Sequence, residues 1–108
     1  MPLELPRFQR ISVIATNDDS FRLVHVDKWF AYVDIFCYDN PCYLGDGTGQ
    51  DILLLTDDIY EIPYPVNLSD LFAKNYTSGS NTRLVLAGLE LSENQFKRLL
   101  EGGIFALR

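Results

Sequence analysis

Short runs in which apolar and polar residues alternate fill most of the chain, and this period of two predicts β-strands. The first run extends from Gln9 to Thr16 and the second from Phe21 to Val26. Residues 17–20 between them are Asn, Asp, Asp and Ser, whose side chains bond to their own backbone in turns, so we predict a hairpin. The third run, Trp29 to Tyr38, is largely apolar on both faces, which indicates a central strand or one covered on both sides. Strict alternation divides this third run into two faces, with Trp29, Ala31, Val33, Ile35 and Cys37 on one and Phe30, Tyr32, Asp34, Phe36 and Tyr38 on the other.

Shorter strands and turns follow in the middle of the chain. Apolar runs predict strands at residues 42–44, 52–55, 59–62 and 83–91. Turn-forming residues separate several of them, at 39–41, 45–50 and 57–58. We expect residues 42–44 to pair with the strand before them, and the three glycines within 45–50 to make that segment a loop. Pro63 and Pro65 lack backbone donors and therefore end the sheet pairing there.

A first short helix is expected after these prolines. Asn67 or Ser69 can cap it, because both side chains can accept a hydrogen bond from the backbone of a first helical turn. Apolar residues follow at helical spacing, so the helix would run to about Tyr76.

A second short helix is expected near the end of the chain. Ser92 and Gln95 form a capping box, in which each side chain bonds to the backbone of the other residue. Residues 102–103 are both glycine and would end this helix, which leaves residues 104–107 to return as a closing strand.

Together these elements predict the α+β class. We expect residues 1–108 to form one small β-rich domain, with a mostly antiparallel sheet or partly open barrel of five to seven strands and two short helices in the C-terminal half. A doubly wound fold is disfavoured, because the links between the first three strands are too short for crossover helices.

Acidic residues are concentrated in the middle of this sequence. Ten of the fifteen lie between Asp18 and Glu61, where Arg22 and Lys28 are the only basic residues, so this segment carries a net charge of minus 8. Residues 1–17 and 62–108 each sum to plus 1, and the net charge of minus 6 therefore comes from the one segment. A surface of this sign repels nucleic acid and anionic membrane, and it favours a basic protein surface or a metal cation.

Apolar run lengths, the two cysteines and the positions of the basic residues argue against a membrane protein, a disulfide-bonded protein and a nucleic-acid-binding protein. Apolar runs such as Ile52 to Leu55 are far too short to cross a bilayer, and residues 1–7 do not resemble a secretory signal, so we expect a cytoplasmic protein without a membrane partner. In that compartment Cys37 and Cys42 are expected to be thiols, although a cross-turn disulfide is geometrically possible. The basic residues are scattered, which argues against nucleic-acid binding.

Catalytic and cofactor chemistry has little support in this sequence. His25 could in principle activate Cys37 or Cys42, but no basic residue near the cysteines would lower a thiol pKa. One histidine and two cysteines cannot complete a four-ligand zinc site. We therefore expect no catalytic residues, no metal ligands and no cofactor.

The glycine-rich segment offers one possible cation site. Residues 47–53 resemble part of the glycine- and aspartate-rich nonapeptide that binds calcium in parallel β-helix proteins, but the segment occurs once. Asp46 and Asp51 could supply oxygen ligands. We favour the interpretation that these aspartates make a hairpin loop soluble.

Several tyrosines lie in or next to the turns in and near the acidic segment, and tyrosine is enriched at protein interfaces. The predicted partner-binding residues are Tyr38, Asp39, Tyr43, Asp46, Glu61 and Tyr64. The alternative is that the rings cover the ends of the sheet and keep their hydroxyl groups in water.

These observations lead to a ranked set of hypotheses. The first is a small acidic, non-enzymatic protein-interaction module, such as an inhibitor, immunity or accessory factor, that binds a basic protein surface. The second is a structural or assembly subunit that homo-oligomerises through an edge strand, for which Trp29 to Phe36 and residues 104–107 are candidates. A third, ranked below these, is a small-ligand or calcium-binding domain that uses Asp46 and Asp51.

Overall fold

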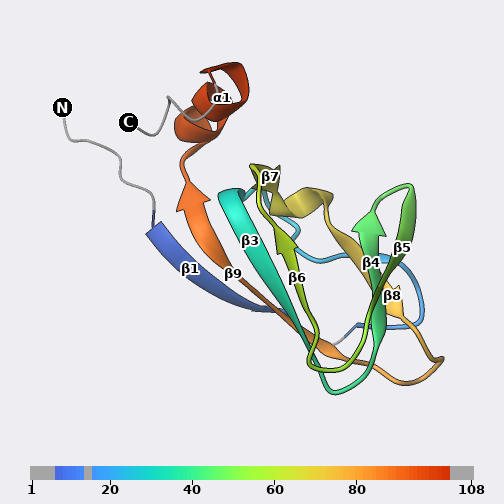
Figure 1. The fold of residues 1–108 in the computed structure, drawn as a ribbon. Helices are drawn as coiled ribbons and strands as arrows, with labels where there is room; N and C mark the ends of the chain where they lie inside the picture. Colours follow the sequence, from blue (N-terminus) through green and yellow to red (C-terminus); the bar gives the residue numbers. More distant parts are fainter. Residues whose placement is uncertain (1–6, 14–15, 103–108) are drawn as a thin grey trace.

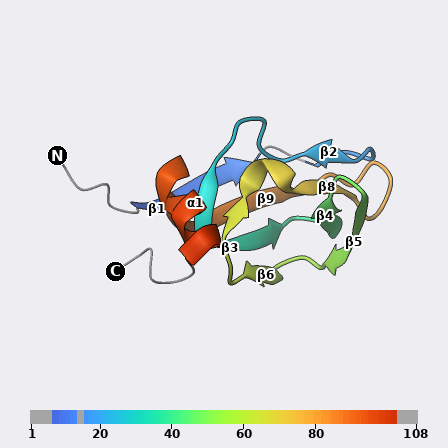
Figure 2. The ribbon, with the colours of Figure 1, turned by 90° about the horizontal axis from the view of Figure 1, so that it is seen from above.

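Two antiparallel β-sheets face each other across one hydrophobic core in the computed structural model, which describes residues 7–13 and 16–102 (Figures 1 and 2). Sheet A has the order β1-β9-β3-β6, with β7 also paired to β3; its strands are β1 (Arg7–Val13), β3 (Trp29–Tyr38), β6 (Ile59–Ile62), β7 (Val66–Asn67) and β9 (Arg83–Leu91). Sheet B has the order β2-β8-β4-β5; its strands are β2 (Phe21–Arg22), β4 (Cys42–Asp46), β5 (Gly49–Leu54) and β8 (Phe72–Asn75). The prediction of a small, mostly antiparallel, β-rich domain is confirmed, but the described residues form two sheets and no closed barrel, and they contain nine strands.

The predicted hairpin between the first two strands is wrong. β1 pairs with β9 in sheet A, whereas β2 pairs with β8 in sheet B. The Asn-Asp-Asp-Ser segment therefore belongs to a connection that carries the chain from one sheet to the other. Its turn chemistry is nevertheless present, because Asp19 N donates a hydrogen bond of 2.9 Å to Asn17 Oδ1.

The prediction that residues 29–38 form a central strand is confirmed, but the predicted division into faces is wrong at its start. β3 is flanked by β9 on one side and by β6 and β7 on the other, so it is not a free edge for self-association. A β-bulge between Phe30 and Val33 shifts the alternation, so that these two side chains are both buried. Opposite the bulge, a Cβ on Gly88 would overlap the Tyr32 carbonyl oxygen, which explains the glycine at this position.

The middle segments pair differently from the prediction. Residues 42–44 belong to β4, which pairs with β5 and β8 and not with the strand before it. Residues 45–50 are not a long loop, because β4 extends to Asp46 and β5 begins at Gly49. The strands predicted at residues 59–62 and 83–91 are confirmed as β6 and β9, and that at 52–55 corresponds to the end of β5.

The first predicted helix is wrong, although its cap is correct. Asn67 Oδ1 accepts a hydrogen bond of 3.1 Å from Ser69 N, but only a 3-10 turn (Leu68–Asp70) follows. The next residues form β8, where Phe72 pairs with Gly45 and Ala73 with Leu44. The conformation of a segment this short depends on what it packs against. Here residues 72–75 pair with the side of β4 that β5 leaves open, and they are therefore a strand.

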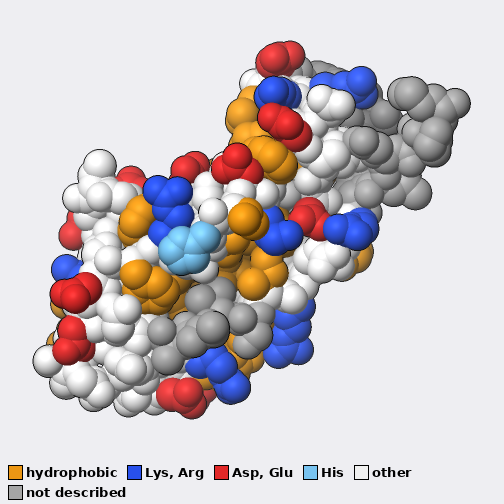
Figure 3. Space-filling view, turned by 180° about the vertical axis from the view of Figure 1, so that it is seen from behind, with side chains coloured by type: hydrophobic (Ala, Val, Ile, Leu, Met, Phe, Trp, Pro, Cys, Tyr) orange, Lys and Arg blue, Asp and Glu red, His pale blue; other side chains and the backbone are white. Residues whose placement is uncertain are grey.

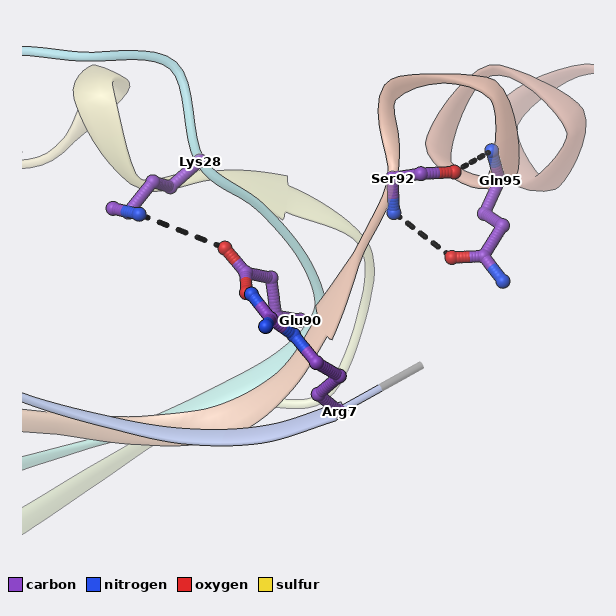
Figure 4. A network of polar contacts seen from close by, with 5 residues as sticks. All are labelled: Arg7, Lys28, Glu90, Ser92 and Gln95. Atoms are coloured by element: carbon purple, nitrogen blue, oxygen red, sulfur yellow. Dashed lines mark hydrogen bonds and ion pairs between the residues drawn. The ribbon is translucent and has the colours of Figure 1, made fainter. Parts of the chain in front are cut away.

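The second predicted helix is confirmed as α1 (Glu93–Gly102), the one α-helix in the described residues. Both bonds of the capping box are present: Ser92 N donates to Gln95 Oε1 at 2.8 Å, and Gln95 N donates to Ser92 Oγ at 3.1 Å (Figure 4). The helix packs at one end of sheet A, where the Phe96 ring lies 6.3 Å from that of Trp29. The predicted closing strand at residues 104–107 lies outside the described residues.

The core lies between the two sheets. Its largest fully buried side chains come from both sheets and from the 3-10 turn, and include Phe30, Ile35, Leu44, Leu68, Leu84 and Leu86. Among the described residues, the structure holds no helix that is long and apolar enough to cross a membrane.

Candidate functional site

The structure distributes the six predicted partner-binding residues over several parts of the molecule. Tyr38 ends β3 and Asp39 begins the turn to β4, whereas Asp46 closes β4 at its opposite end. Tyr64 is exposed and lies between β6 and β7, at the end of sheet A where β3 begins. Asp39 and Asp46 therefore cannot belong to one small contact patch.

Glu61 and Tyr43 lie apart from both ends. Glu61 is in β6, where it pairs in register with Asp34 of β3. Tyr43 is in the middle of β4, on the side of sheet B that points away from the core, since the neighbouring Cys42 and Leu44 are buried. The predicted set thus contains residues from two sheets and from both ends of the molecule.

One end of the molecule instead collects several acidic connections, and we call it the turn end. Four connections meet there, at residues 16–20, 39–41, 55–58 and 76–82. Asp57 N donates to Cys37 O at 2.8 Å, and Asn40 Nδ2 donates to Asn81 O at 2.8 Å. Asp18 Oδ1 accepts from Gly79 N at 2.8 Å. The turn end carries five aspartates: Asp18, Asp19, Asp39, Asp57 and Asp58.

Two of these five carboxylates stabilise the local fold. Asp18 accepts hydrogen bonds from Gly79 N, Asn75 Nδ2 and Ser78 Oγ. These bonds, with that from Gly79 the largest contribution, hold the pKa of Asp18 below its usual range. Asp58 Oδ2 accepts from Leu55 N at 2.9 Å and so closes the turn between β5 and β6.

The other three carboxylates have no such role within the described residues. Asp19, Asp39 and Asp57 are exposed, and their side chains make no hydrogen bond or ion pair with any residue that the structure describes. Asp39 and Asp57 also have left-handed backbone conformations, with φ of 69° and 70°. Aspartate adopts this conformation more readily than most residues, so the turns themselves explain the residue type at these two positions in part.

Tyr38 and Tyr76 adjoin the connections that carry these carboxylates, whereas Tyr43 lies further along β4. The Arg83 guanidinium lies 5.2 Å from the centre of the Tyr38 ring, and Lys74 Nζ lies 5.7 Å from that of Tyr43. Tyr76 is half exposed and packs on Tyr43 with 5.4 Å between ring centres. Tyr76 is absent from the predicted set because its segment reads as a helix; the register of β8 with β4, which brings the two rings together, is a long-range feature.

Negative charge does not continue over the whole surface. On the face seen in Figure 3, Lys and Arg side chains lie among acidic and apolar ones. This distribution differs from the turn end, whose four connections contain five aspartates and no lysine or arginine; Lys74 and Arg83 lie in the adjoining strands β8 and β9.

The possible cation site around Asp46 is a turn cap in this structure. Asp46 Oδ1 accepts hydrogen bonds from Thr48 Oγ1 at 2.6 Å, Thr48 N at 2.8 Å and Gly49 N at 3.2 Å. These bonds lower the pKa of Asp46, with the Thr48 hydroxyl contributing most. Within residues 7–13 and 16–102, no three His, Cys, Asp or Glu side chains are grouped so that they could hold a metal ion.

The two cysteines lie together in the core. Cys37 and Cys42 are buried free thiols in contact with each other, and Cys37 Sγ donates to Asn40 O at 3.2 Å. The thiol–thiol hydrogen bond lowers the pKa of Cys37 to about 7 and raises that of Cys42. The lowering at Cys37 comes from hydrogen bonds to its thiol and not from a basic residue, and the nearby Asp58 and Asp39 oppose it. His25 is exposed and forms no hydrogen bond to either thiol.

A separate polar network joins the strands near α1 (Figure 4). Glu90 of β9 forms ion pairs with Arg7 of β1 at 2.6 Å and with Lys28 at 3.7 Å. The Glu90 side chain is 14% exposed and that of Arg7 is 69% exposed, so solvent screens the ion pair that joins the start of β1 to the end of β9. These contacts hold β1 against β9. The ion-paired residues Arg7, Lys28 and Glu90 include no nucleophile.

No protein-family model, curated protein or solved structure matches the chain. Its function is therefore argued from its own residues. Among the described residues, the turn end combines unpaired carboxylates with partly exposed aromatic rings.

Proposed function

We propose that this chain is a small, non-enzymatic protein-interaction domain that binds a basic protein surface through the turn end. The observation that carries the proposal is the position of Asp19, Asp39 and Asp57. They come from three separate connections, yet they lie at one end of the molecule without a partner among the described residues. A basic partner could pair with them without breaking an internal bond.

The surroundings of these carboxylates support the same function. Tyr38 and Tyr76 offer ring surface beside them at a low cost in conformational entropy, which is typical of residues at the centre of an interface. Charges at the rim of an interface mainly accelerate association and set specificity. An inhibitor or accessory factor that recognises a basic surface needs aromatic contact area and complementary charge, and it needs no catalytic group.

The test removes the free carboxylates without disturbing the turns. The triple variant Asp19→Asn/Asp39→Asn/Asp57→Asn loses three negative charges, and asparagine tolerates the left-handed conformation at positions 39 and 57. A matched control, Asp51→Asn/Glu61→Gln/Asp70→Asn, loses the same charge from exposed positions outside the turn end. Each tagged protein is used to capture proteins from its native cells, with quantitative mass spectrometry at low and high salt.

We expect wild type and the control variant to retain a common basic protein at low salt and to release it at high salt. The turn-end variant should retain it at least about tenfold less well, because three charge pairs worth about 0.5 kcal/mol each are lost. Equal loss in both triple variants would show that only net charge matters. Equal retention in both would exclude the turn end as the binding surface.

A further inference from the structure

The face of sheet A that points away from sheet B carries apolar side chains. On β1 the residues that point to this face include Phe8 and Arg10, because Ile11 points into the core. Phe8 is 78% exposed, the largest value among the big hydrophobic side chains of the described residues. Beside it is a shallow hollow of about 330 Å³. Besides residues of β1, the hollow is lined by Tyr32, Asp34, Ala87 and Gly88.

β1 is also an edge strand. The order β1-β9-β3-β6 gives it β9 as its only paired neighbour in the described part of the chain, so the backbone groups on its other side have no strand partner there. A free strand edge pairs readily with another strand. Arg7, which would repel a second copy, is neutralised by its ion pair with Glu90.

We propose that two copies of the chain associate through antiparallel pairing of their β1 strands, with Gln9 at the two-fold axis. Charge and reach favour this register over those with Arg10 or Ile11 at the axis. With Gln9 at the axis, Phe8 of each copy lies opposite Arg10 of the other, which gives two ring–cation pairs on the outer face. With Arg10 at the axis, the two Arg10 side chains would oppose each other. With Ile11 at the axis, Phe8 would lie beyond the paired residues of β1.

The same register gathers the exposed rings. Diagonal neighbours in an antiparallel pair are about 7–8 Å apart, a distance that aromatic side chains can bridge, and the two Phe8 residues are such neighbours. Sheet A would then continue across the two-fold axis from one copy to the other. This contact involves β1 and none of the five aspartates of the turn end, so the inference does not depend on the proposed function.

A charge exchange tests the register. In Phe8→Lys, the introduced ammonium group would oppose Arg10 of the second copy, so the dissociation constant of the dimer should rise at least about tenfold. In Phe8→Lys/Arg10→Glu, opposite charges meet again and dimerisation should return. Val26→Lys is the control, because Val26 is also an exposed hydrophobic residue but lies outside sheet A. Sedimentation equilibrium gives the constants, and far-UV circular dichroism shows that each variant is folded.

Cross-linking gives a second measurement of the same geometry. Gln9→Cys should form a disulfide between copies on mild oxidation, because residues at the axis face each other directly. Arg10→Cys should not, because its counterpart lies on the diagonal, and the native cysteines are buried. A wild-type protein that stays monomeric at all concentrations, a Phe8→Lys dimer of unchanged affinity, or cross-linking at position 10 and not at position 9 would each overturn the proposal.

Discussion

Single side chains hold the connections of this molecule in place, and Asp18 is the clearest case. Its carboxylate accepts hydrogen bonds from Gly79, Asn75 and Ser78, which lie in β8 and in the connection from β8 to β9. Each bond favours the charged form, and this is why the pKa of Asp18 is lowered although the group is exposed. Stability should therefore depend on pH in a way that can be assigned to this residue.

Acid should remove the contribution of Asp18. A carboxyl group with a lower pKa in the folded state stabilises the fold above its unfolded pKa, here 3.8, and the contribution is lost as pH falls through the folded pKa. The melting temperature of Asp18→Asn should accordingly be lower at neutral pH and fall less steeply between about pH 5 and pH 2. Asp51→Asn should follow wild type. Parallel curves for wild type and Asp18→Asn would contradict the assignment.

Gly88 is a second residue whose identity follows from its position. A side chain there would meet the Tyr32 carbonyl at the β3 bulge. We expect Gly88→Ala to lower the free energy of unfolding by about 2 kcal/mol or more, the usual cost of overpacking a tight site. Gly47→Ala is a suitable control, because a Cβ at Gly47 would make only ordinary contact with the Phe72 ring. Urea unfolding measures both, and equal effects would show that the close approach is relaxed easily.

At the scale of elements, α1 depends on its capping box. Ser92→Ala removes the hydroxyl that accepts from Gln95 N, and the loss of such a cap costs about 1 kcal/mol. Amide exchange in α1 should become about fivefold faster. The fluorescence of Trp29, which packs near Phe96, reports whether the helix stays in place. Asn94→Ala, an exposed change within the helix, is the control, and equal exchange in both variants would show that the cap is dispensable.

Elements were predictable from the sequence where short-range chemistry decides them. The Ser92 and Gln95 capping box, the cap at Asn67 and the turn at Asn17 each involve residues two or three positions apart. The conformation of residues 72–75 was not predictable in this way. Its apolar spacing fits a helix as well as a strand, and the choice depends on pairing with β4, which is distant in sequence.

At the scale of the molecule, the sequence indicates the fold class but not the strand order. Alternation predicts a strand from Gln9 to Thr16, which overlaps β1, but nothing within these residues shows that β9 is the neighbour. For the candidate site too, the sequence indicates the residue types but not which of them lie together. That Asp19, Asp39 and Asp57 are acidic turn residues can be read directly, whereas their shared location follows from how four connections meet.

The place of β9 in sheet A also affects how the protein is made. β9 lies between β1 and β3, although it is the last strand in the described part of the chain. Until residues 83–91 have left the ribosome, β1 lacks its neighbour and β3 is open along one side. Contacts between such distant segments also slow folding. We therefore expect sheet A to assemble only after residues 83–91 have been synthesised, which leaves the apolar strands β1 and β3 accessible to chaperones until then.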